Sequence, residues 1–169
     1  FDVKDDALEL IASVSDGSFR DAESLLDQLT SGGETITLAR VEKLIGRVGM
    51  RRTATLAERL LSNDLQGSLQ YVAEIQEAGF NVNDLTKELI HYLRRALSLK
   101  FDPKLEGLFA RELTAESLAE LKKHSAMVRE ELHIPLIKSL IRAYSEMRYS
   151  PFQAIPLEVA IIENLQKAR

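Results

Sequence analysis

The sequence predicts an all-α fold, and three observations support that prediction. Between points where Gly, Pro and Asn gather, apolar residues recur every three or four positions, which is the spacing of one helix face. No run of alternating apolar and polar residues is long enough to form a strand. The 169 residues are 45% hydrophobic and 28% charged, a composition typical of globular chains and not of disordered or collagen-like ones. We therefore expect about nine helices.

The first three helices are expected within the N-terminal 45 residues. Asp5 to Ser15 carries a one-sided apolar stripe. Ser18 begins the second helix as an N-cap, because its hydroxyl can accept a hydrogen bond from a free amide of the first turn. Thr37 caps the third helix in the same way. These helices are expected to end at Asp16-Gly17, before Ser31-Gly32-Gly33 and at Gly46.

The segment Gly46-Arg47-Val48-Gly49 is the best candidate for a domain boundary. Two glycines within four residues stop helix propagation, since glycine loses the most backbone entropy in a helix. We expect one domain over residues 1–48 and a second over residues 49–169.

Further helices are expected along the second domain. Pro135 has no amide hydrogen, so it either begins a helix in its first turn or kinks one, and we favour a start. The last helix is apolar on more than one side, which indicates a central helix or one that faces a partner. The expected segments are Thr53 to Ser62, Asn63-Asp64 to Gly79, Asn83 or Asp84 to the break at Phe101-Asp102-Pro103, Leu105 to Phe109, a segment capped by Thr114, Pro135 to Met147, and Pro156 to Leu165.

Several kinds of chemistry are absent from the sequence. It has no cysteine, which excludes thiolate catalysis and cysteine-ligated zinc, and it has no phosphate loop, G-x-G-x-x-G or H-E-x-x-H motif. His91, His124 and His133 lie far apart in sequence, and we expect them at the surface. Carboxylate pairs such as Asp5-Asp6 and Glu130-Glu131 fit solvated helix faces. We expect no catalytic residue and no metal site.

Charge and hydropathy also bear on whether the chain binds nucleic acid or spans a membrane. A net charge of −4 argues weakly against binding nucleic acid through the overall field of the chain. No stretch approaches 18 consecutive apolar residues, so no membrane span is expected. Two small basic clusters fit solvated helix faces better than a DNA contact: Arg47, Arg51 and Arg52, and Arg94, Arg95 and Lys100.

One residue does not fit a generic helix. If Ser18 is the N-cap, Arg20 lies in the first turn, where a cation opposes the helix dipole at a cost of a few tenths of a kcal/mol. That position is useful if the guanidinium and the free amides hold one phosphate together. The plainer interpretation is a surface arginine paired with Asp16 or Asp21. Spacing alone leaves both open.

The segment Gly17 to Gln28, GSFRDAESLLDQ, resembles the lid of bacterial AAA+ clamp-loader ATPases, the gamma and tau subunits of DNA polymerase III. The segment Ile36 to Gly46 resembles the third lid helix of that family. Leu136 to Arg148, followed by Ser150-Pro151-Phe152 and Leu157 to Ala160, more loosely resembles the last two helices of the family's collar, its oligomerisation domain. The resemblance implies a partial AAA+ lid bundle followed by a larger helical collar.

The resemblance also implies roles. Arg20 stands at the sensor 2 position, whose arginine reaches the γ-phosphate of ATP bound mainly by the preceding domain. The family's phosphate loop, zinc cysteines and arginine finger have no counterpart here, and Phe1 stands first in place of Met, so we expect a piece of a longer chain. ATP and Mg²⁺ are expected only with the full-length protein, and none on this part alone. The expected partners are other clamp-loader subunits (gamma/tau, delta and delta-prime), with the sliding clamp and primed DNA reached through the whole complex.

The chain itself is therefore not expected to be an enzyme, although its parent would be an ATPase subunit of a cytoplasmic DNA polymerase III. Two alternatives remain open. One is the lid and oligomerisation segment of another AAA+ protein at replication forks. The other is a stand-alone helical module that binds DNA or a partner helix.

Overall fold

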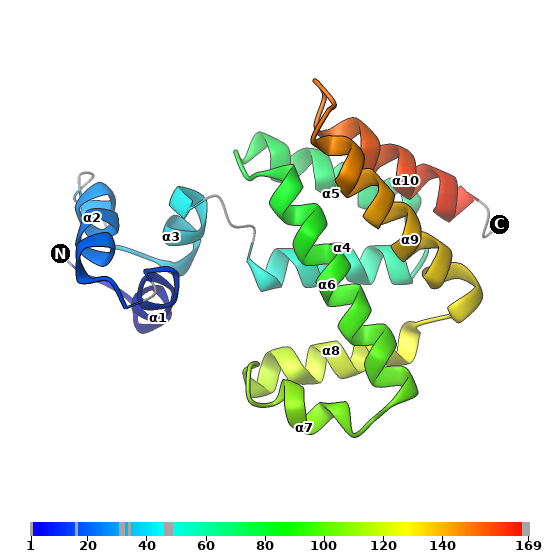
Figure 1. Cartoon of the computed structure of the whole chain (residues 1–169), viewed down its shortest axis with the longest axis horizontal. Coiled ribbons are helices and arrows are strands. Elements are labelled where there is room, and N and C mark those ends of the chain that lie inside the picture. Colours follow the sequence, from blue (N-terminus) through cyan, green and yellow to red (C-terminus); the bar gives the residue numbers. More distant parts are fainter. Residues whose placement is uncertain (1, 16, 31–32, 34, 46–48, 167–169) are drawn as a thin grey trace. The chain divides into compact units, whose positions relative to one another are not determined.

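The computed structural model describes residues 2–15, 17–30, 33, 35–45 and 49–166. These residues form ten α-helices and no strand, so the predicted all-α fold is confirmed with one helix more than expected (Figure 1). The chain divides into two compact units, Phe1–Gly49 and Met50–Arg169. Each has a core of its own, and each is described by itself. Of the predicted boundary segment, residues 46–48 lie outside the described residues, as do Asp16, Ser31 and Gly32 among the predicted helix ends.

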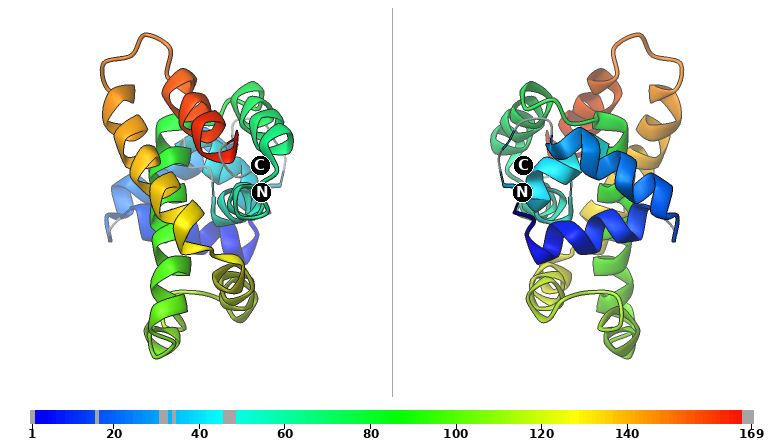
Figure 2. Two further views of the ribbon diagram at one scale, coloured as in Figure 1. Left: turned by 90° about the vertical axis from the view of Figure 1, so that its right-hand side faces the viewer. Right: turned by 90° about the vertical axis from the view of Figure 1, so that its left-hand side faces the viewer.

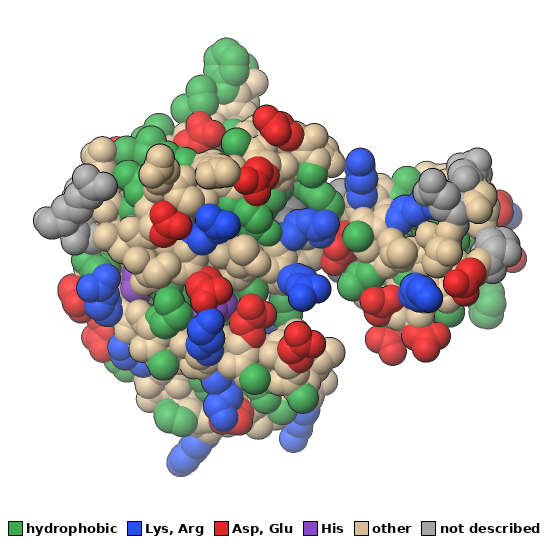
Figure 3. Space-filling model, turned by 180° about the vertical axis from the view of Figure 1, so that it is seen from behind, with side chains coloured by type: hydrophobic (Ala, Val, Ile, Leu, Met, Phe, Trp, Pro, Cys, Tyr) green, Lys and Arg blue, Asp and Glu red, His purple; other side chains and the backbone are tan. Residues whose placement is uncertain are grey.

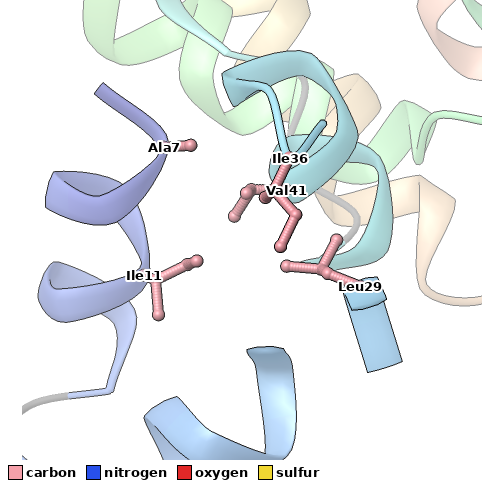
Figure 4. Packing of buried hydrophobic residues seen from close by; sticks show 5 residues of the cluster. All are labelled: Ala7, Ile11, Leu29, Ile36 and Val41. Carbon is pink, nitrogen blue, oxygen red and sulfur yellow. The ribbon is translucent and has the colours of Figure 1, made fainter. Parts of the chain in front are cut away.

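Unit 1 consists of three short helices, α1 (Asp5–Val14), α2 (Phe19–Thr30) and α3 (Leu38–Ile45). All three pack against one another. Their shared core is small and contains five buried side chains that point toward one another in Figure 4: Ala7, Ile11, Leu29, Ile36 and Val41.

A β-bridge that the sequence did not predict closes unit 1. Val3 and Ile36 form an isolated parallel bridge. The amide of Lys4 donates to the carbonyl of Ile36 at 3.1 Å, and the amide of Ile36 donates to the carbonyl of Asp2 at 2.8 Å. One residue on each side is too short a stretch to show an alternating pattern, so no sequence signal was available for it.

Unit 2 is a bundle of seven helices around α6. Helix α6 packs against α4, α8 and α9, while α10 packs against α9 and α5, as Figures 1 and 2 show. The helices are α4 (Met50–Leu61), α5 (Leu65–Glu77), α6 (Val82–Phe101), α7 (Leu105–Phe109), α8 (Ala115–Met127), α9 (Glu130–Met147) and α10 (Ala154–Gln166).

The core of unit 2 is built mainly from leucines on the inward faces of these helices. Burying each such side chain contributes roughly 1.5–3 kcal/mol relative to leaving it in water. The largest fully buried apolar residues are Leu56, Leu60, Leu85, Leu89, Leu93, Leu121, Leu136, Leu140, Leu157 and Ile161.

Side-chain caps set the starts of three helices in unit 2, α5, α6 and α8. Thr114 accepts a hydrogen bond from the amide of Ser117 at 3.1 Å, so this predicted cap is confirmed. At the predicted start Asn63-Asp64, the Asp64 side chain accepts a hydrogen bond from the amide of Gly67 at 2.9 Å. The expected cap of α6, Asn83 or Asp84, is wrong. The Asn81 side chain accepts from the amides of both residues, at 2.8 and 3.3 Å, and the helix begins at Val82.

The expected start of α9 at Pro135 is also wrong, because the helix begins at Glu130 and contains the proline. Pro135 has no N–H to donate to the carbonyl of Glu131, four residues earlier. Both residues are exposed, so water can satisfy that carbonyl. Near the start of the same helix, Nδ1 of His133 accepts from the amide of Arg129 at 2.8 Å.

Two other starts differ by a few residues. Helix α4 begins at Met50, three residues before the expected Thr53. Helix α10 begins at Ala154, so Pro156 lies within its first turn, where a missing amide removes no intrahelical hydrogen bond.

Candidate functional site

Arg20 lies in the first turn of α2, as the sequence predicts. Ser18 is the cap, since its Oγ accepts from the amide of Asp21 at 3.3 Å and its carbonyl accepts from Ala22 at 3.1 Å. Gly17 precedes the cap with a φ of 79°, a backbone conformation that favours glycine. The chain therefore enters α2 through a turn that fixes where Arg20 emerges.

The Arg20 side chain is exposed and makes no ion pair with any residue that the structure describes. A pairing with Asp21 is thereby excluded, while Asp16 lies outside the described residues. Unit 1 contains ten Asp and Glu against five Lys and Arg, so a cation without a partner is unexpected there. Figure 3 shows acidic side chains gathered on this unit.

Phe19, the residue before Arg20, is also exposed to solvent. Phe19, the first residue of α2, is 87% exposed, the largest exposure among the large apolar side chains described. The far end of α2 is held in the core by Leu29, as Figure 4 shows. Helix α2 thus packs on the core of unit 1 through Leu29 and the partly buried Ala22, Leu25 and Leu26, and it exposes Phe19 and Arg20 at its start.

Chemically, this arrangement can contact one anionic group. The free amides of the first turn and one guanidinium suit a single terminal phosphate. A Mg²⁺–triphosphate needs carboxylate ligands as well, and the described residues hold no group of three or more His, Asp or Glu that could bind a metal ion. The described residues at the start of α2 therefore suit contact with one phosphate group.

The basic clusters of unit 2 are largely occupied by partners within the chain. The guanidinium of Arg52 lies 4.3 Å from the ring centre of Phe80. Arg95 forms an ion pair with Glu112 at 2.6 Å. Lys100 donates to the carbonyl of Val128. These contacts fit the interpretation as helix faces, and Arg47 lies outside the described residues.

The expectation that all three histidines lie at the surface is wrong for two of them. His124 and His133 are buried, and only His91 is exposed. A sequence signal existed for His124, because it follows the buried Leu121 by three residues on the apolar face of α8. That periodicity should have outweighed the polarity of the side chain.

His124 joins three helices of unit 2. Its Nδ1 lies 2.7 Å from the hydroxyl of Tyr92 on α6. Burial raises the pKa of Tyr92, so its hydroxyl keeps its proton, and the direction of this hydrogen bond depends on which ring nitrogen of His124, Nδ1 or Nε2, carries the histidine proton. That Nε2 has no hydrogen-bond partner among the described residues, and it lies 3.9 Å from a carboxylate oxygen of Glu58 on α4.

Glu58 is shared between a buried and an exposed neighbour. Its other oxygen accepts from Lys123 at 2.6 Å, and this hydrogen bond lowers the pKa of Glu58. Burial lowers the pKa of His124 more than the nearby Glu58 and Glu120 raise it. The cluster is therefore a structural link among α4, α6 and α8.

The surface of α9 and α10 is the other unusual feature. Tyr149 and Phe152, in the loop that joins these helices, are exposed, and Figure 3 shows hydrophobic side chains projecting there. Ile141, Ile155 and Val159 are exposed on the helices themselves. The predicted second apolar side of the last helix is confirmed. No helix among the described residues is long and apolar enough to cross a bilayer.

Two protein families match the chain. Residues 36–168 match the family described as DNA polymerase III subunits gamma and tau, domain III. Residues 1–34 match the DNA polymerase III clamp loader subunit, ATPase lid domain. The boundary between the two matches thus precedes α3, whereas the compact units separate after Gly49.

The chain also resembles individual proteins. The chain is 30% identical over 165 residues to the DNA polymerase III subunit tau of Bacillus subtilis, covering 97% of this chain and 29% of that protein. It is 32% identical over 136 residues to Protein STICHEL-like 1 of Arabidopsis thaliana, covering 76% of this chain and 12% of that protein. The chain therefore spans less than a third of the length of either relative.

A solved structure, the Bacillus subtilis DNA clamp loader delta protein, has the same fold with a TM-score of 0.60. The match covers 97% of this chain and 51% of the delta chain at 16% sequence identity. Because the identity is that low, the likeness concerns the fold alone.

Proposed function

The chain belongs to the family of DNA polymerase III gamma and tau subunits, and on that premise we propose that it serves as the lid and collar of a clamp-loader subunit. In this proposal residues 1–48 act as the lid and residues 49–169 as the collar. The collar holds clamp-loader subunits together. The lid brings Arg20 to ATP bound by an ATPase domain, and the ring so formed loads a sliding clamp onto primed DNA.

The observation that carries the proposal for the lid is the state of Arg20. An exposed guanidinium without an ion pair to any described residue, in the first turn of a capped helix, costs stability through the helix dipole. Within an acidic unit that cost is readily avoided by pairing. A bound phosphate offsets it, since the guanidinium and the amides then point at one anion.

ATP and Mg²⁺ enter this proposal only through their fit to the residues present. Arg20 and the start of α2 suit the γ-phosphate, the most distant phosphate of ATP from its base. The described carboxylates form no cluster for Mg²⁺, so the metal and the other phosphates belong to the ATPase domain in this scheme. The role of Arg20 is to sense the terminal phosphate, whose loss on hydrolysis removes the contact.

For the collar, the supporting features are its independent core and its exposed apolar surface on α9 and α10. A surface that binds a partner needs a rigid core beneath it, and the buried leucines of unit 2 form such a core. The partners are other clamp-loader subunits, namely gamma/tau, delta and delta-prime.

The test is Arg20→Ala in the whole subunit, because the ATPase domain must be present. ATP-dependent clamp loading should fall by about tenfold or more, since a charge-assisted contact to phosphate contributes roughly 1.5–3 kcal/mol. Co-purification with the other subunits should be unchanged. Lys43→Ala is the matched control, because Lys43 is an exposed cation in the last turn of α3. Loss of assembly in Arg20→Ala, or full activity, would contradict the division of labour.

A further inference from the structure

Helix α6, the long helix that crosses unit 2 in Figure 1, has an exposed face with cations at helical spacing. Lys87, His91 and Arg94 are exposed, and they follow one another by four and three residues, so they share one side of the helix. Ser98 and Phe101 continue this α6 stripe, and Phe101 is 60% exposed. From residue 87 to residue 101 the stripe is about 21 Å long, since a helix rises roughly 1.5 Å per residue.

The two permanent cations of the α6 stripe have no carboxylate partner. Neither Lys87 nor Arg94 forms an ion pair with a residue that the structure describes, and the His91 ring forms no hydrogen bond with one. Arg95 and Lys100, on other sides of the same helix, both have partners within the chain. The unpaired cations of α6 therefore gather on its exposed face.

The carboxylates near the α6 stripe do not neutralise its middle. Glu88, next to Lys87, accepts a hydrogen bond from the hydroxyl of Thr53 on α4 at 3.3 Å. Asp84 lies one turn before Lys87, and Asp102 is the C-cap, so these two carboxylates stand at the ends of the stripe. Unit 2 as a whole contains sixteen acidic and seventeen basic residues, so the net negative charge of the chain resides in unit 1.

We propose that the α6 stripe binds single-stranded DNA, with Lys87, His91 and Arg94 on successive phosphates and the ring of Phe101 stacked on a base. This contact goes beyond the proposed lid and collar roles, because it belongs to unit 2 itself and needs neither ATP nor another subunit.

The composition of the α6 stripe favours a nucleic acid over a protein partner. The core of a protein interface is enriched in large apolar residues and depleted of Lys. Among the described residues of α6, Phe101 is the one exposed large apolar side chain. A chain of phosphates needs only cations and N–H donors at intervals along a line, which residues 87, 91 and 94 supply.

The exposed ring of Phe101 favours a single strand over a duplex. An aromatic side chain stacks on a base whose face is free, whatever the base, and the bases inside a duplex have no free face. The length of the α6 stripe also suits a short site of roughly four nucleotides.

Phe101→Trp tests the stacking directly, because the chain contains no tryptophan of its own. Titration with an oligo(dT) strand of about twelve nucleotides at low salt should quench the fluorescence of this variant, since a base would lie on the indole ring. The matched control is Tyr149→Trp, at an aromatic position that is 85% exposed and outside the stripe, where no quenching is expected. Equal quenching at both positions, or none at position 101, would overturn the proposal.

Fluorescence anisotropy of labelled oligo(dT) tests the phosphate contacts. In the double variant Lys87→Ala and Arg94→Ala the affinity should fall about tenfold or more, and the slope of log affinity against log salt concentration should shrink by about 1.4, since each phosphate contact contributes about 0.7. The double variant Lys43→Ala and Arg111→Ala removes two exposed cations outside the stripe and should bind as the wild type does. Equal losses in the two double variants would overturn the assignment to α6.

Phe101→Ala separates stacking from charge. It should weaken binding about fivefold or more and leave the salt slope unchanged, because the ring contacts a base and not a phosphate. A changed slope with unchanged affinity would contradict the stacking role.

Two further probes decide the class of partner. A DNA duplex of equal length and polyglutamate are both anionic but offer no free base along their length, so each should bind about tenfold more weakly than oligo(dT). Equal binding of polyglutamate would overturn the choice of a nucleic acid, and equal binding of the duplex would overturn the choice of a single strand. Neither result bears on the lid and collar, which are tested by ATP-dependent clamp loading and by co-purification.

Discussion

The two units differ in the size of their hydrophobic cores and in the extent of their helix packing. Unit 1 has 49 residues, three helices of eight to twelve residues and five fully buried side chains in its core. Unit 2 has seven helices, of which α6 alone has 20 residues and packs against five others. A chain of about 50 residues buries too small a fraction of its surface to be more than marginally stable, whereas about 120 residues suffice.

The difference agrees with the separate roles proposed for the two units. In the proposed function unit 1 has only to keep the start of α2 in position, and a small core is adequate for that. Unit 2 has an extended apolar surface on α9 and α10, and a rigid core is needed to keep such a surface in shape. The charges agree with this division, because unit 1 is acidic, with ten acidic and five basic residues, while unit 2 is nearly balanced, with sixteen and seventeen.

The largest effect is expected from Ile36→Ala. Ile36 is fully buried and forms the bridge to Val3, and loss of such a side chain costs about 2–5 kcal/mol. We expect this loss to unfold unit 1 while unit 2 remains folded, with fast hydrogen exchange confined to peptides before residue 50. In the matched control, Ile161→Ala, an equally buried isoleucine is lost from unit 2, which should be destabilised but stay folded. Simultaneous unfolding of both units in Ile36→Ala would contradict the comparison.

Mild acid should destabilise unit 2 rather than unit 1, because all three histidines lie in unit 2. Burial lowers the pKa of His124 and His133 in the fold; Glu58, Glu120 and Lys123 surround the first, and Arg129, Glu131 and Lys100 the second. A histidine that binds its proton only when unfolded contributes stability above the unfolded pKa of about 6.5. That contribution is lost as the pH falls toward the folded pKa, by up to about 1.4 kcal/mol per pH unit for each histidine.

Urea unfolding of unit 2 between neutral pH and about pH 5.5 measures this loss. The variant His124→Asn together with His133→Asn should remove most of the slope, since asparagine does not titrate. The lowered pKa of Glu58 affects stability in a separate pH range. Its contribution is lost only as the pH falls below about 4.3, the ordinary pKa of a glutamate. An equal loss of stability in unit 1 over the same pH range would contradict the attribution of this loss to the buried histidines of unit 2.

The smallest effect is expected from Ser18→Ala. The substitution removes the hydrogen bond from the amide of Asp21, at a cost of about 1 kcal/mol. Helix α2 should fray at the end that carries Arg20, seen as faster exchange of the first-turn amides, while unit 2 is unaffected. Ser18→Asp, which retains a cap, should restore protection. No change in Ser18→Ala would mean that the turn at Gly17 alone fixes the helix start.

Local chemistry made much of the fold predictable. The helical spacing of leucines and the caps Ser18, Asp64 and Thr114 set helix positions that the structure confirms. Where several good caps stand close together, spacing cannot choose among them, and Asn81 precedes Asn83 and Asp84 by only a few residues. Pro135 failed as a start signal because the exposure of its face, a property of tertiary packing, makes an interior proline tolerable.

The candidate site was predictable in part. Its helix start and the position of Arg20 follow from Ser18, but the absence of a partner for the guanidinium among the described residues could be seen only in three dimensions. The cluster of Tyr92, His124 and Glu58 was missed because its members come from three helices that are distant in sequence. The role of Arg20 at a phosphate stays a prediction until the ATPase reaction is measured.

The bridge between Val3 and Ile36 has a mechanical consequence. Tension applied to the chain ahead of α1 reaches the start of α3 through two backbone hydrogen bonds, without passing along α1 or α2. Those two helices form a closed side loop outside the line of force. Tension can therefore cross unit 1 through these hydrogen bonds without stretching the backbone of the helix that carries Arg20.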